Sequence, residues 1–360
     1  MFKILDLGKN ILRSNVSRLP FPYKLTFAVT YWCNYRCKTC NIWERRPKDE
    51  LSLEDIQRFF RKSPSFNWID FTGGEVWLRR DFVEIVRSAV TNCPNLYSVH
   101  FPTNGFMTDR IVSGVEKIVE MKAPKLTVTV SVDGDEAVND QVRGIKGGWR
   151  HQMDTYKALS KLRGVEVYLG MTLSSLNAEQ YDKAFAAAKQ EAPWLTHKGF
   201  HINVAHESAH YYGNSGMVLI QDKNRIRREV KRYLALRGPS LDPVNWIERR
   251  YLKHADKYLE TGATPIRCHA LRSSCFVNPW GEVYPCGMFD RKIAGLRDHD
   301  FDMGAIWNLD KTKQLQQEIW DYQCPQCWTP CEANQSLLGN LLGQHNRRVQ
   351  ARGLPGNAPT

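Results

Sequence analysis

Short runs rich in β-branched and aromatic residues alternate with amphipathic helical patterns along the first 205 residues. Extended segments are expected at 25–30, 67–72, 96–101, 125–132, 165–173 and 199–205. Helical periodicity falls between them, at 52–62, 80–91, 108–121, 150–162 and 177–190. Repeated strand-then-helix units predict a parallel sheet with right-handed crossovers. Six such strands make an open doubly wound sheet or a partial barrel, and in both folds ligands gather at the carboxyl ends of the strands.

Two of these helices carry a start signal. Ser52 with Asp55, and Asn177 with Gln180, have the spacing of capping boxes, in which two side chains satisfy backbone N–H groups at a helix N-terminus. The pattern therefore predicts that both pairs mark the first turns of helices.

The flanking segments differ from this alternating region. Residues 1–21 predict a helix with an apolar and a basic side, either packed over the core or lying at a membrane surface. Residues 222–261 are charged and helical and indicate a solvated connector, with nucleic-acid contact a weaker alternative. The tail, 336–360, again places leucines beside basic residues: Leu337, Leu338, Leu341, Leu342, Arg347 and Arg348. Both ends weakly indicate a lipid or membrane-surface partner.

Composition narrows the class of protein. The chain has 360 residues, 42% hydrophobic and 24% charged, enough for one large domain and a smaller one. Its ten cysteines are clustered and no signal peptide opens the chain, which favours metal binding in the cytoplasm over an extracellular disulfide framework. No apolar run reaches the length of a membrane span, so we expect at most a peripheral association. A net charge of +12 suits an anionic partner, although the spread of Lys and Arg makes nucleic acid unlikely.

The first cysteine cluster directly follows the first expected strand. Cys33, Cys37 and Cys40 lie in one short loop, and thiolates select iron–sulfur clusters, zinc or copper(I). A structural zinc site uses four ligands, and no fourth Cys or His lies in this loop. The spacing favours a cluster with one open iron over buried structural cysteines.

Polar and glycine-rich signals follow the other strands at the same rim. Gly73-Gly74 lets the backbone approach a ligand, Glu75 suits an ammonium group, and Arg143 suits a carboxylate. An ammonium and a carboxylate together describe an amino acid. Taken singly, these residues are also common in turns, caps and surfaces. The remaining rim candidates are Asn104, Ser131 and Thr172.

Acid–base candidates collect at the end of the sixth strand. His201 and Asn203 alternate with apolar neighbours, so both are expected to face the interior, where His suits proton transfer near neutral pH. A satisfied core or surface histidine is the alternative. Five further titratable side chains follow: His206, Glu207, His210, Tyr211 and Tyr212.

A second cysteine cluster lies near the C-terminus. Its members are Cys268, Cys275, Cys286, Cys324, Cys327 and Cys331. The run Asn278-Pro279-Trp280-Gly281-Glu282 predicts a hairpin turn that brings Cys275 and Cys286 together. A zinc ribbon is one way to use such pairs. Cys93 stands alone, and we interpret it as structural.

Two motifs follow the first two strands: Cys33-x3-Cys37-x2-Cys40 after the first and Gly73-Gly74-Glu75 after the second. In these motifs the chain resembles the radical S-adenosylmethionine (SAM) superfamily. The resemblance implies a partial (β/α)6 TIM-like barrel over 22–221, with a [4Fe-4S] cluster on the three cysteines whose open iron is chelated by SAM. It also implies that Glu75 and the Gly73-Gly74 backbone meet the SAM amino group.

By the same resemblance, Ser131 and Arg143 contact the carboxylate and ribose of SAM, with Asn104 and Thr172 as further contacts. Two positions depart from the family pattern. Thr39 stands where an aromatic residue is usual, so Ile42 or Trp43 is expected to contact adenine. Val76 stands where proline is usual.

The second cysteine cluster, over 262–335, resembles the SPASM/twitch extension that holds auxiliary iron–sulfur clusters in this superfamily. Its six cysteines are more than one cluster with four thiolate ligands requires and fewer than two such clusters require. We therefore expect one auxiliary [4Fe-4S] cluster, with Cys268 and Cys286 as its surest ligands and the rest drawn from the other four.

The resemblance implies an enzyme that cleaves SAM reductively to a 5'-deoxyadenosyl radical and abstracts hydrogen from its substrate. An auxiliary cluster favours an oxidative outcome: dehydrogenation, or C–C or C–S bond formation. A flavodoxin or ferredoxin is the implied electron donor. The short N-terminal segment is expected to lack cobalamin and leader-peptide domains. A lipid- or polysaccharide-modifying enzyme and a peptide-maturing enzyme are the alternatives, and a zinc-stabilised nucleic-acid-binding protein is the non-enzyme alternative.

Overall fold

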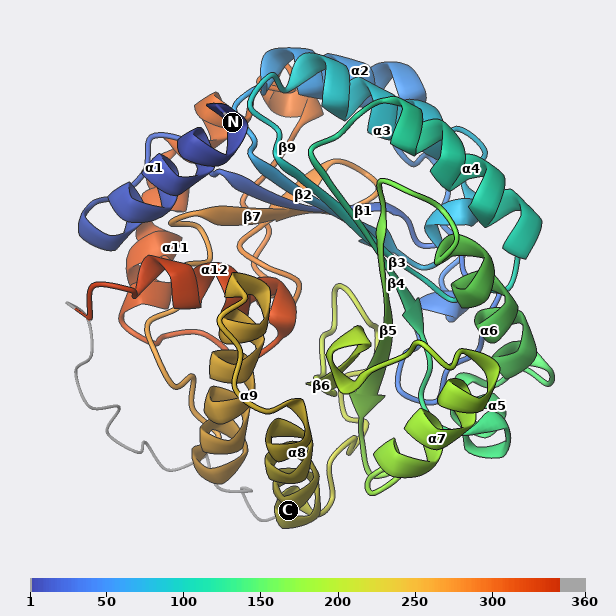
Figure 1. The fold of residues 1–360 in the computed structure, drawn as a ribbon. Coiled ribbons are helices and arrows are strands. Elements are labelled where there is room, and N and C mark those ends of the chain that lie inside the picture. Colours follow the sequence, from blue (N-terminus) through green and yellow to red (C-terminus); the bar gives the residue numbers. More distant parts are fainter. Residues whose placement is uncertain (1, 344–360) are drawn as a thin grey trace.

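The computed structural model describes residues 2–343, and its centre is one nine-stranded sheet (Figure 1). The spatial order of the strands is β6-β5-β4-β3-β2-β1-β7-β8-β9. The strands are β1 Lys24–Thr30, β2 Trp68–Gly73, β3 Ser98–Thr103, β4 Lys125–Ser131, β5 Glu166–Leu173, β6 Phe200–Val204, β7 Ser274–Val277, β8 Glu282–Tyr284 and β9 Ala294–Gly295.

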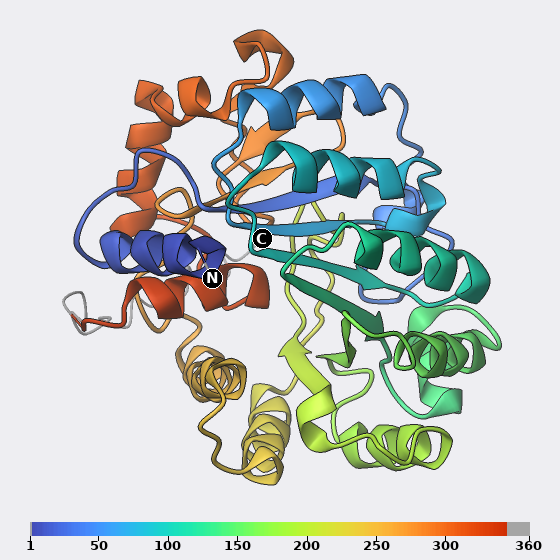
Figure 2. The ribbon, with the colours of Figure 1, turned by 45° about the horizontal axis from the view of Figure 1, so that its top comes forward.

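Strands β1 to β6 are parallel neighbours in chain order, which confirms the predicted alternating α/β architecture. The helices between and after them curve around one side of the sheet (Figures 1 and 2). They are α2 Leu53–Lys62, α3 Phe82–Asn92, α4 Thr108–Glu120, α5 Glu136–Arg143, α6 Gly148–Leu159 and α7 Tyr181–Glu191. The sequence pattern had not indicated α5.

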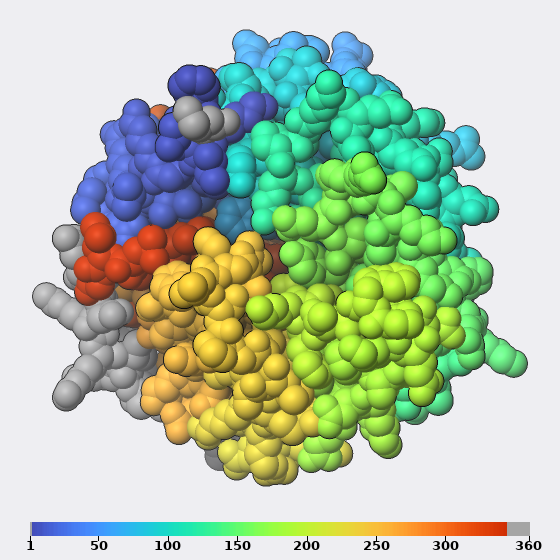
Figure 3. Space-filling view, viewed as in Figure 1, coloured from blue at the N-terminus to red at the C-terminus, as the bar shows by residue number. Residues whose placement is uncertain are grey.

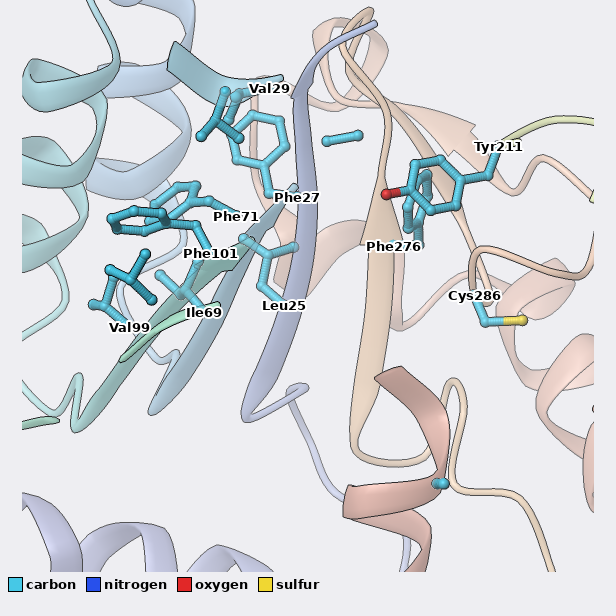
Figure 4. Close-up of a cluster of buried hydrophobic side chains, with 14 of the residues drawn as sticks. Leu25, Phe27, Val29, Ile69, Phe71, Val99, Phe101, Tyr211, Phe276 and Cys286 are labelled. Atoms are coloured by element: carbon cyan, nitrogen blue, oxygen red, sulfur yellow. The ribbon is translucent and has the colours of Figure 1, made fainter. Parts of the chain in front are cut away.

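Alternation along the strands separates a helix-facing core from a polar interior. Figure 4 shows the strand side chains that point toward the helices: Leu25, Phe27, Val29, Ile69, Phe71, Val99 and Phe101. All of these are fully buried. Their polar neighbours in sequence, such as Asp70, His100 and Thr129, point to the opposite, interior face, since side chains alternate along a strand.

The C-terminal extension continues the barrel sheet. Strand β7 pairs in parallel with β1, so Lys24 lies opposite Ser274 and Phe27 opposite Val277. The predicted hairpin is confirmed, because β7 and β8 are antiparallel and Gly281, with φ +80°, occupies the turn between them. Strand β1 therefore has a neighbour on each side and every one of its residues is buried.

Of the two helix-start signals, one is confirmed and one is wrong. Ser52 and Asp55 form a reciprocal capping box at α2. Helix α7 begins at Tyr181 without a side-chain cap. Asn177 instead donates hydrogen bonds from Nδ2 to the carbonyls of Asp133 (3.0 Å) and Thr172 (2.9 Å). The Asn177 side chain, which has both donor and acceptor atoms, therefore joins two rim loops and does not cap a helix.

The remaining helices cover the ends of the molecule. The connector forms α8 Lys223–Arg237 and α9 Pro243–Thr261, and α1 Phe2–Val16 packs beside α12 Pro330–Gly339 (Figures 1 and 2). Helices α10 Met303–Trp307 and α11 Asp310–Trp320 follow β9 and precede α12 in the chain. Across residues 2–343, no helix has the length and apolarity needed to cross a membrane. The tail residues Arg347 and Arg348 lie outside the described residues.

Candidate functional site

The first cysteine loop leaves β1 at Thr30 and is held in place by two segments that are distant in sequence. Lys38 N–H donates to Val142 O (2.8 Å), at the end of α5. Asn41 N–H donates to Tyr212 O (2.9 Å) beyond β6. The loop is thereby fixed over the carboxyl ends of the strands, with Cys33, Cys37 and Cys40 free and partly buried.

The three thiols lie within electrostatic reach of one another. Burial, together with the nearby Glu75 carboxylate and Cys37, raises the pKa of Cys33 to about 12. Burial, and then Cys37 and Cys33, raise the pKa of Cys40 to about 12. Such thiols are neutral without a metal, and a soft metal centre displaces their protons when it binds. Within residues 2–343 no three Cys, His, Asp or Glu side chains converge on a point where one ion would sit. Cluster thiolates bind different iron atoms, so they need not converge in that way.

Gly73 and Gly74 bring β2 against the start of this loop. Gly74 N–H donates to Thr30 O (2.8 Å) and Glu75 N–H donates to Trp32 O (2.8 Å). A Cβ atom on Gly74 would overlap Trp32 O and touch the side chain of Cys33. Gly73 adopts φ +141°, a conformation that L side chains rarely adopt. Both positions therefore require glycine, because the backbone of β2 contacts the cysteine loop at these residues.

The Glu75 carboxylate lies just below this rim. It is 1% exposed, and it accepts hydrogen bonds from Asn104 N–H (2.6 Å) and Thr103 Oγ1 (2.9 Å). Burial raises the pKa of Glu75 to about 7. In this arrangement Glu75 orients the end of β3, and Asn104 in turn donates from Nδ2 to Asn34 Oδ1 (2.7 Å) within the cysteine loop.

Asp133 joins the rim residues of β4 and β5. Its Oδ2 accepts from Arg143 Nη1 (2.8 Å) and its Oδ1 accepts from Thr172 N–H (2.9 Å). Ser131, half-buried at the end of β4, pairs with Gly170 on β5. Sequence reasoning had not singled out Asp133, although it lies in the polar run after the fourth strand.

Arg143 is the residue best suited to an anionic ligand at the cysteine loop. It lies over the ring of Tyr35 (5.2 Å), and after burial its largest electrostatic influence is Cys37, followed by Asp133. Its Nε is buried and has no hydrogen-bond partner within residues 2–343. A guanidinium with one edge on Asp133 and an unsatisfied N–H fits a carboxylate of the kind that SAM carries.

The positions that depart from the family pattern are partly enclosed. Ile42 is 4% exposed and Val76 is 1% exposed, so both pack in the core. Trp43 is half-buried, lies under Arg36 (5.7 Å) and keeps its Nε1 without a partner. Of the two residues expected to contact adenine, Trp43 is the more accessible.

His201 and Asn203 occupy different ends of β6. Asn203 lies opposite Thr172, at the rim. His201 lies near the start of the strand, where Nδ1 is 3.3 Å from Glu248 Oε1 and the ring meets Tyr168 edge-on. It lines a cavity of about 140 Å³ with Arg237 and Asn245. His201 is therefore positioned away from the cysteine loop.

The second cysteine cluster separates into a group of four and two outliers. Burial, then Glu332, Cys327 and Cys324, raise the pKa of Cys268 above the usual thiol value. Burial, then Glu332, Cys327 and Cys268, do the same for Cys286. These influences place Cys268, Cys286, Cys324 and Cys327 near one another.

Cys275 and Cys331 have other surroundings. Cys275 lies on β7, opposite Leu25 on β1, and among the described residues Glu332 is the one charged group that influences its pKa. Cys331, in α12, is influenced first by burial and then by Lys24 and Asp70. The turn between β7 and β8 therefore forms as expected, while its two flanking cysteines lie in different environments.

A buried polar network lies between the group of four and the barrel interior. Lys24 Nζ is 3.0 Å from Asp70 Oδ2 and donates to Gln335 Oε1 (3.0 Å). Ser274 Oγ donates to Glu332 Oε2 (2.8 Å), and Gln335 donates to the same carboxylate. Burial raises the pKa of Glu332 to about 7. Sequence reasoning missed Lys24 and Glu332; the position of Glu332 next to Cys331 was the available signal.

Residues 205–214, here called the strap, link the two cysteine regions. Asn214 Nδ2 donates to Thr39 O (2.8 Å) in the first loop and to His206 O (3.1 Å). His206 Nε2 accepts from Trp328 N–H (3.0 Å), next to Cys327, and Ser208 Oγ donates to Gly287 O (2.6 Å), next to Cys286. Figure 4 shows Tyr211 of the strap on the interior side of β1, near Phe276 and Cys286. The strap thus fixes the separation of the two regions.

Comparisons with known proteins agree with this geometry. Residues 27–188 match the model of the radical SAM superfamily, and residues 268–332 match that of the SPASM iron–sulfur cluster-binding domain. The first match contains the loop with Cys33, Cys37 and Cys40, and the second contains all six C-terminal cysteines. Together the two matches span more than half of the chain.

Several curated relatives align along most of the chain. The antilisterial bacteriocin subtilosin biosynthesis protein AlbA of Bacillus subtilis (strain 168) is 25% identical, over 95% of this chain and 72% of AlbA. The sporulation killing factor maturation protein SkfB of the same strain is 24% identical, over 86% and 71%. Mycofactocin maturase MftC of Mycolicibacterium smegmatis is 26% identical, over 90% and 79%.

Solved structures show the same fold. Streptococcus suis SuiB bound to S-adenosylmethionine superposes with a TM-score of 0.58 at 16% identity, over 86% of this chain and 70% of SuiB. The structure of anSMEcpe with bound AdoMet and a peptide gives 0.60 at 15% identity, over 83% and 84%. With both family matches in place, the cofactors are a [4Fe-4S] cluster, SAM and at least one auxiliary iron–sulfur cluster. The chain belongs to the radical SAM superfamily and carries a C-terminal SPASM domain.

Proposed function

We propose that this radical SAM enzyme carries out an oxidative modification of a peptide. The observation that supports the chemistry is the joining of two cysteine regions to one sheet, with the strap between them. The observation that supports a peptide is that AlbA, SkfB and MftC, named for the biosynthesis or maturation of such products, align along most of the chain.

In this proposal Cys33, Cys37 and Cys40 hold the SAM-binding cluster, and Arg143 and Gly74 orient SAM. When bound, the cluster and SAM supply a carbon radical that abstracts hydrogen from a C–H bond. Arg143 donates its unpartnered Nε–H to the carboxylate, while Asp133 holds the guanidinium in place. The Gly74 backbone lies against Trp32 and Cys33, so it would flank the amino group of SAM.

We further propose that Cys268, Cys286, Cys324 and Cys327 would hold one auxiliary cluster, which would supply an acceptor for the electron that an oxidative outcome removes from the substrate. Their mutual electrostatic influence supports this set. Cys275 lies on β7, which pairs with β1, and Cys331 lies near Lys24. These positions support excluding both cysteines from the ligands of the auxiliary cluster. The same proximity of four thiols would also suit zinc, so metal content must be measured.

The test has two stages. The protein is prepared without oxygen, and iron, sulfide and zinc are measured together with 5'-deoxyadenosine formed from SAM after reduction with dithionite. We expect a brown protein with about eight irons per chain, two [4Fe-4S] clusters, and 5'-deoxyadenosine. A colourless zinc protein would contradict the enzyme.

The second stage identifies the substrate class. Cells grown in deuterated water are fractionated into peptides, lipids and polysaccharides, and each fraction is added to the active enzyme. We expect deuterium in 5'-deoxyadenosine only with the peptide fraction. Transfer from lipid or polysaccharide would overturn the peptide assignment while leaving the radical chemistry intact.

A further inference from the structure

Helix α1 is packed with its polar side inward. Its only buried residues are Ser14 and Asn15. Asn10 Nδ2 donates to Asn67 Oδ1 (2.8 Å), and Asn67 Nδ2 donates to Asp6 Oδ2 (2.9 Å). Asn15 Nδ2 donates to Leu338 O (2.9 Å), just before the end of α12. The face that holds the helix on the protein therefore combines the polar residues at 6, 10, 14 and 15 with the half-buried Leu7 and Ile11.

The opposite side of α1 exposes large apolar side chains. The exposed fractions are 82% for Phe2, 59% for Leu5, 56% for Leu12 and 60% for Val16. Steps of three, seven and four residues place these side chains on one helical face, which also carries the exposed Lys9, and Ile4 is 49% exposed. An amphipathic helix usually buries such a stripe in its own core, and a contiguous exposed stripe indicates an interaction surface.

Two further leucines extend the stripe. Leu342 N–H donates to Asn15 Oδ1 (3.1 Å), which holds the residues after α12 against α1. Leu341 is 42% exposed and Leu342 is 52% exposed. Figure 3 shows the N-terminal segment (blue) as an outer edge of the molecule with the α12 region (red) next to it. The apolar surface is thus built from both ends of the described chain.

Charge on this surface has one sign. The exposed residues of α1 other than the apolar ones are Lys9 and Arg13, and no acidic residue of α1 is exposed. Its one acidic residue, Asp6, is held by Asn67 on the inward face. An apolar helical face whose exposed charges, Lys9 and Arg13, are both cations complements a layer of hydrocarbon beneath anionic headgroups.

We propose that the outward face of α1, with Leu341 and Leu342, docks on an anionic lipid bilayer. In this arrangement Phe2, Leu5 and Leu12 enter the boundary between headgroups and acyl chains, while Lys9 and Arg13 pair with lipid phosphates. The docking brings the enzyme to a membrane surface whichever substrate class it modifies, so it stands apart from the proposed function.

The test is co-sedimentation of the full chain with vesicles of phosphatidylcholine alone or mixed with phosphatidylglycerol, at low and high salt. We expect binding to the mixed vesicles that weakens as salt is added. Lys9→Gln/Arg13→Gln should weaken it about 25-fold, about fivefold for each charge removed. Leu5→Ser/Leu12→Ser should weaken it about 100-fold, because two leucines lose their burial.

Matched control variants lie on the connector. Leu241→Ser changes a leucine that is 103% exposed, and Arg250→Gln/Lys253→Gln removes two exposed charges from α9. Both should bind vesicles like the natural sequence. Equal iron content in all variants shows that each has folded.

Three results would overturn the proposal. One is absence of binding to the mixed vesicles at low salt. Another is equal weakening by the connector variants. The third is a dimer in light scattering that Leu5→Ser/Leu12→Ser converts to a monomer without vesicle binding, which would assign this face to a second copy of the chain.

Discussion

The two cysteine regions both present thiol ligands for a soft metal centre, but they are built in opposite ways. The first takes three thiols from one loop after β1, and its neighbouring charges are the Arg143 guanidinium and the Glu75 carboxylate. The second gathers thiols from segments as far apart as Cys268 and Cys327, and its neighbouring charge is the Glu332 carboxylate. Beside the first region, Arg143 Nε has no hydrogen-bond partner among the described residues.

This difference teaches what each region is suited to bind. A loop of three thiols beside a cation suits a centre that shares its fourth position with an anionic cofactor. Four thiols gathered from separate segments beside a carboxylate suit a centre completed by protein alone. The strap joins the two through Asn214 and His206, so the regions are held at a fixed separation.

The largest expected effect comes from removing a thiol of the first loop. Cys37→Ala should lower 5'-deoxyadenosine formation more than about 1,000-fold, because the cluster that reduces SAM loses a ligand. Iron should fall by about four atoms per chain. The measurements are liquid chromatography of the nucleoside and iron analysis after anaerobic purification.

Cys93→Ala is the control for that change. Cys93 is fully buried near α3 and lies apart from both cysteine regions, so its loss should leave iron and 5'-deoxyadenosine unchanged. An iron content in Cys37→Ala equal to that of the natural sequence would contradict the assignment of the first loop.

The next effect separates the two regions. Cys324→Ala should also remove about four irons but leave SAM cleavage within about threefold, because the first loop is intact. Cys275→Ala is the matched variant, since Cys275 pairs into the sheet and should keep all the iron. If Cys275→Ala loses iron, or if Cys324→Ala keeps all of it, the auxiliary cluster has a different set of cysteine ligands.

The contrast between these regions also explains how much the sequence could reveal. The six parallel strands and the first loop were predicted, because strand periodicity and a local cysteine spacing survive in the linear chain. The choice among Cys275, Cys324, Cys327 and Cys331 was left open. That choice depends on β7 pairing with β1, which turns Cys275 into the sheet, and no local pattern specifies that pairing.

Other residues were missed because their roles depend on long-range contacts. Asp133 joins Arg143 to Thr172 only after α5, itself unpredicted, returns Arg143 to the rim. Asn177 had the spacing of a helix cap but bonds to two rim carbonyls. Side chains with several donor and acceptor atoms take the strongest partners that the fold offers, and those partners are distant in sequence.

A smaller effect is expected at the cation beside the first loop. Arg143→Ala should raise the dissociation constant of SAM about 100-fold, since it removes one partner of a buried charged hydrogen bond and leaves Asp133 unpaired. Arg143→Lys should recover part of this affinity, because lysine keeps the charge without the planar fork. Calorimetric titration of the iron-loaded protein gives both values. Similar affinities for SAM in Arg143→Ala and the natural sequence would remove Arg143 from the site.

The smallest effect concerns the strap at low pH. Burial lowers the pKa of His206 to about 4, so the folded protein keeps this imidazole neutral while the unfolded chain takes up a proton near pH 6.5. The contribution of His206 to the free energy of unfolding is therefore complete above about pH 6.5. It falls by about 1.4 kcal/mol per pH unit as the pH drops toward 4, or about 2 kcal/mol at pH 5.

Urea unfolding of the metal-free protein between pH 5 and pH 7.5 measures this dependence. The other groups whose pKa is shifted by burial, among them His210, Glu75 and Glu332, are the same in both proteins, so the slope of the free energy of unfolding against pH should differ between the natural sequence and His206→Gln by one proton, about 1.4 kcal/mol per pH unit. Gln keeps an acceptor for Trp328 N–H, which preserves the link to the second cysteine region. If both proteins show the same slope, His206 is charged in the fold, and its hydrogen bond from Trp328 cannot be what joins the strap to that region.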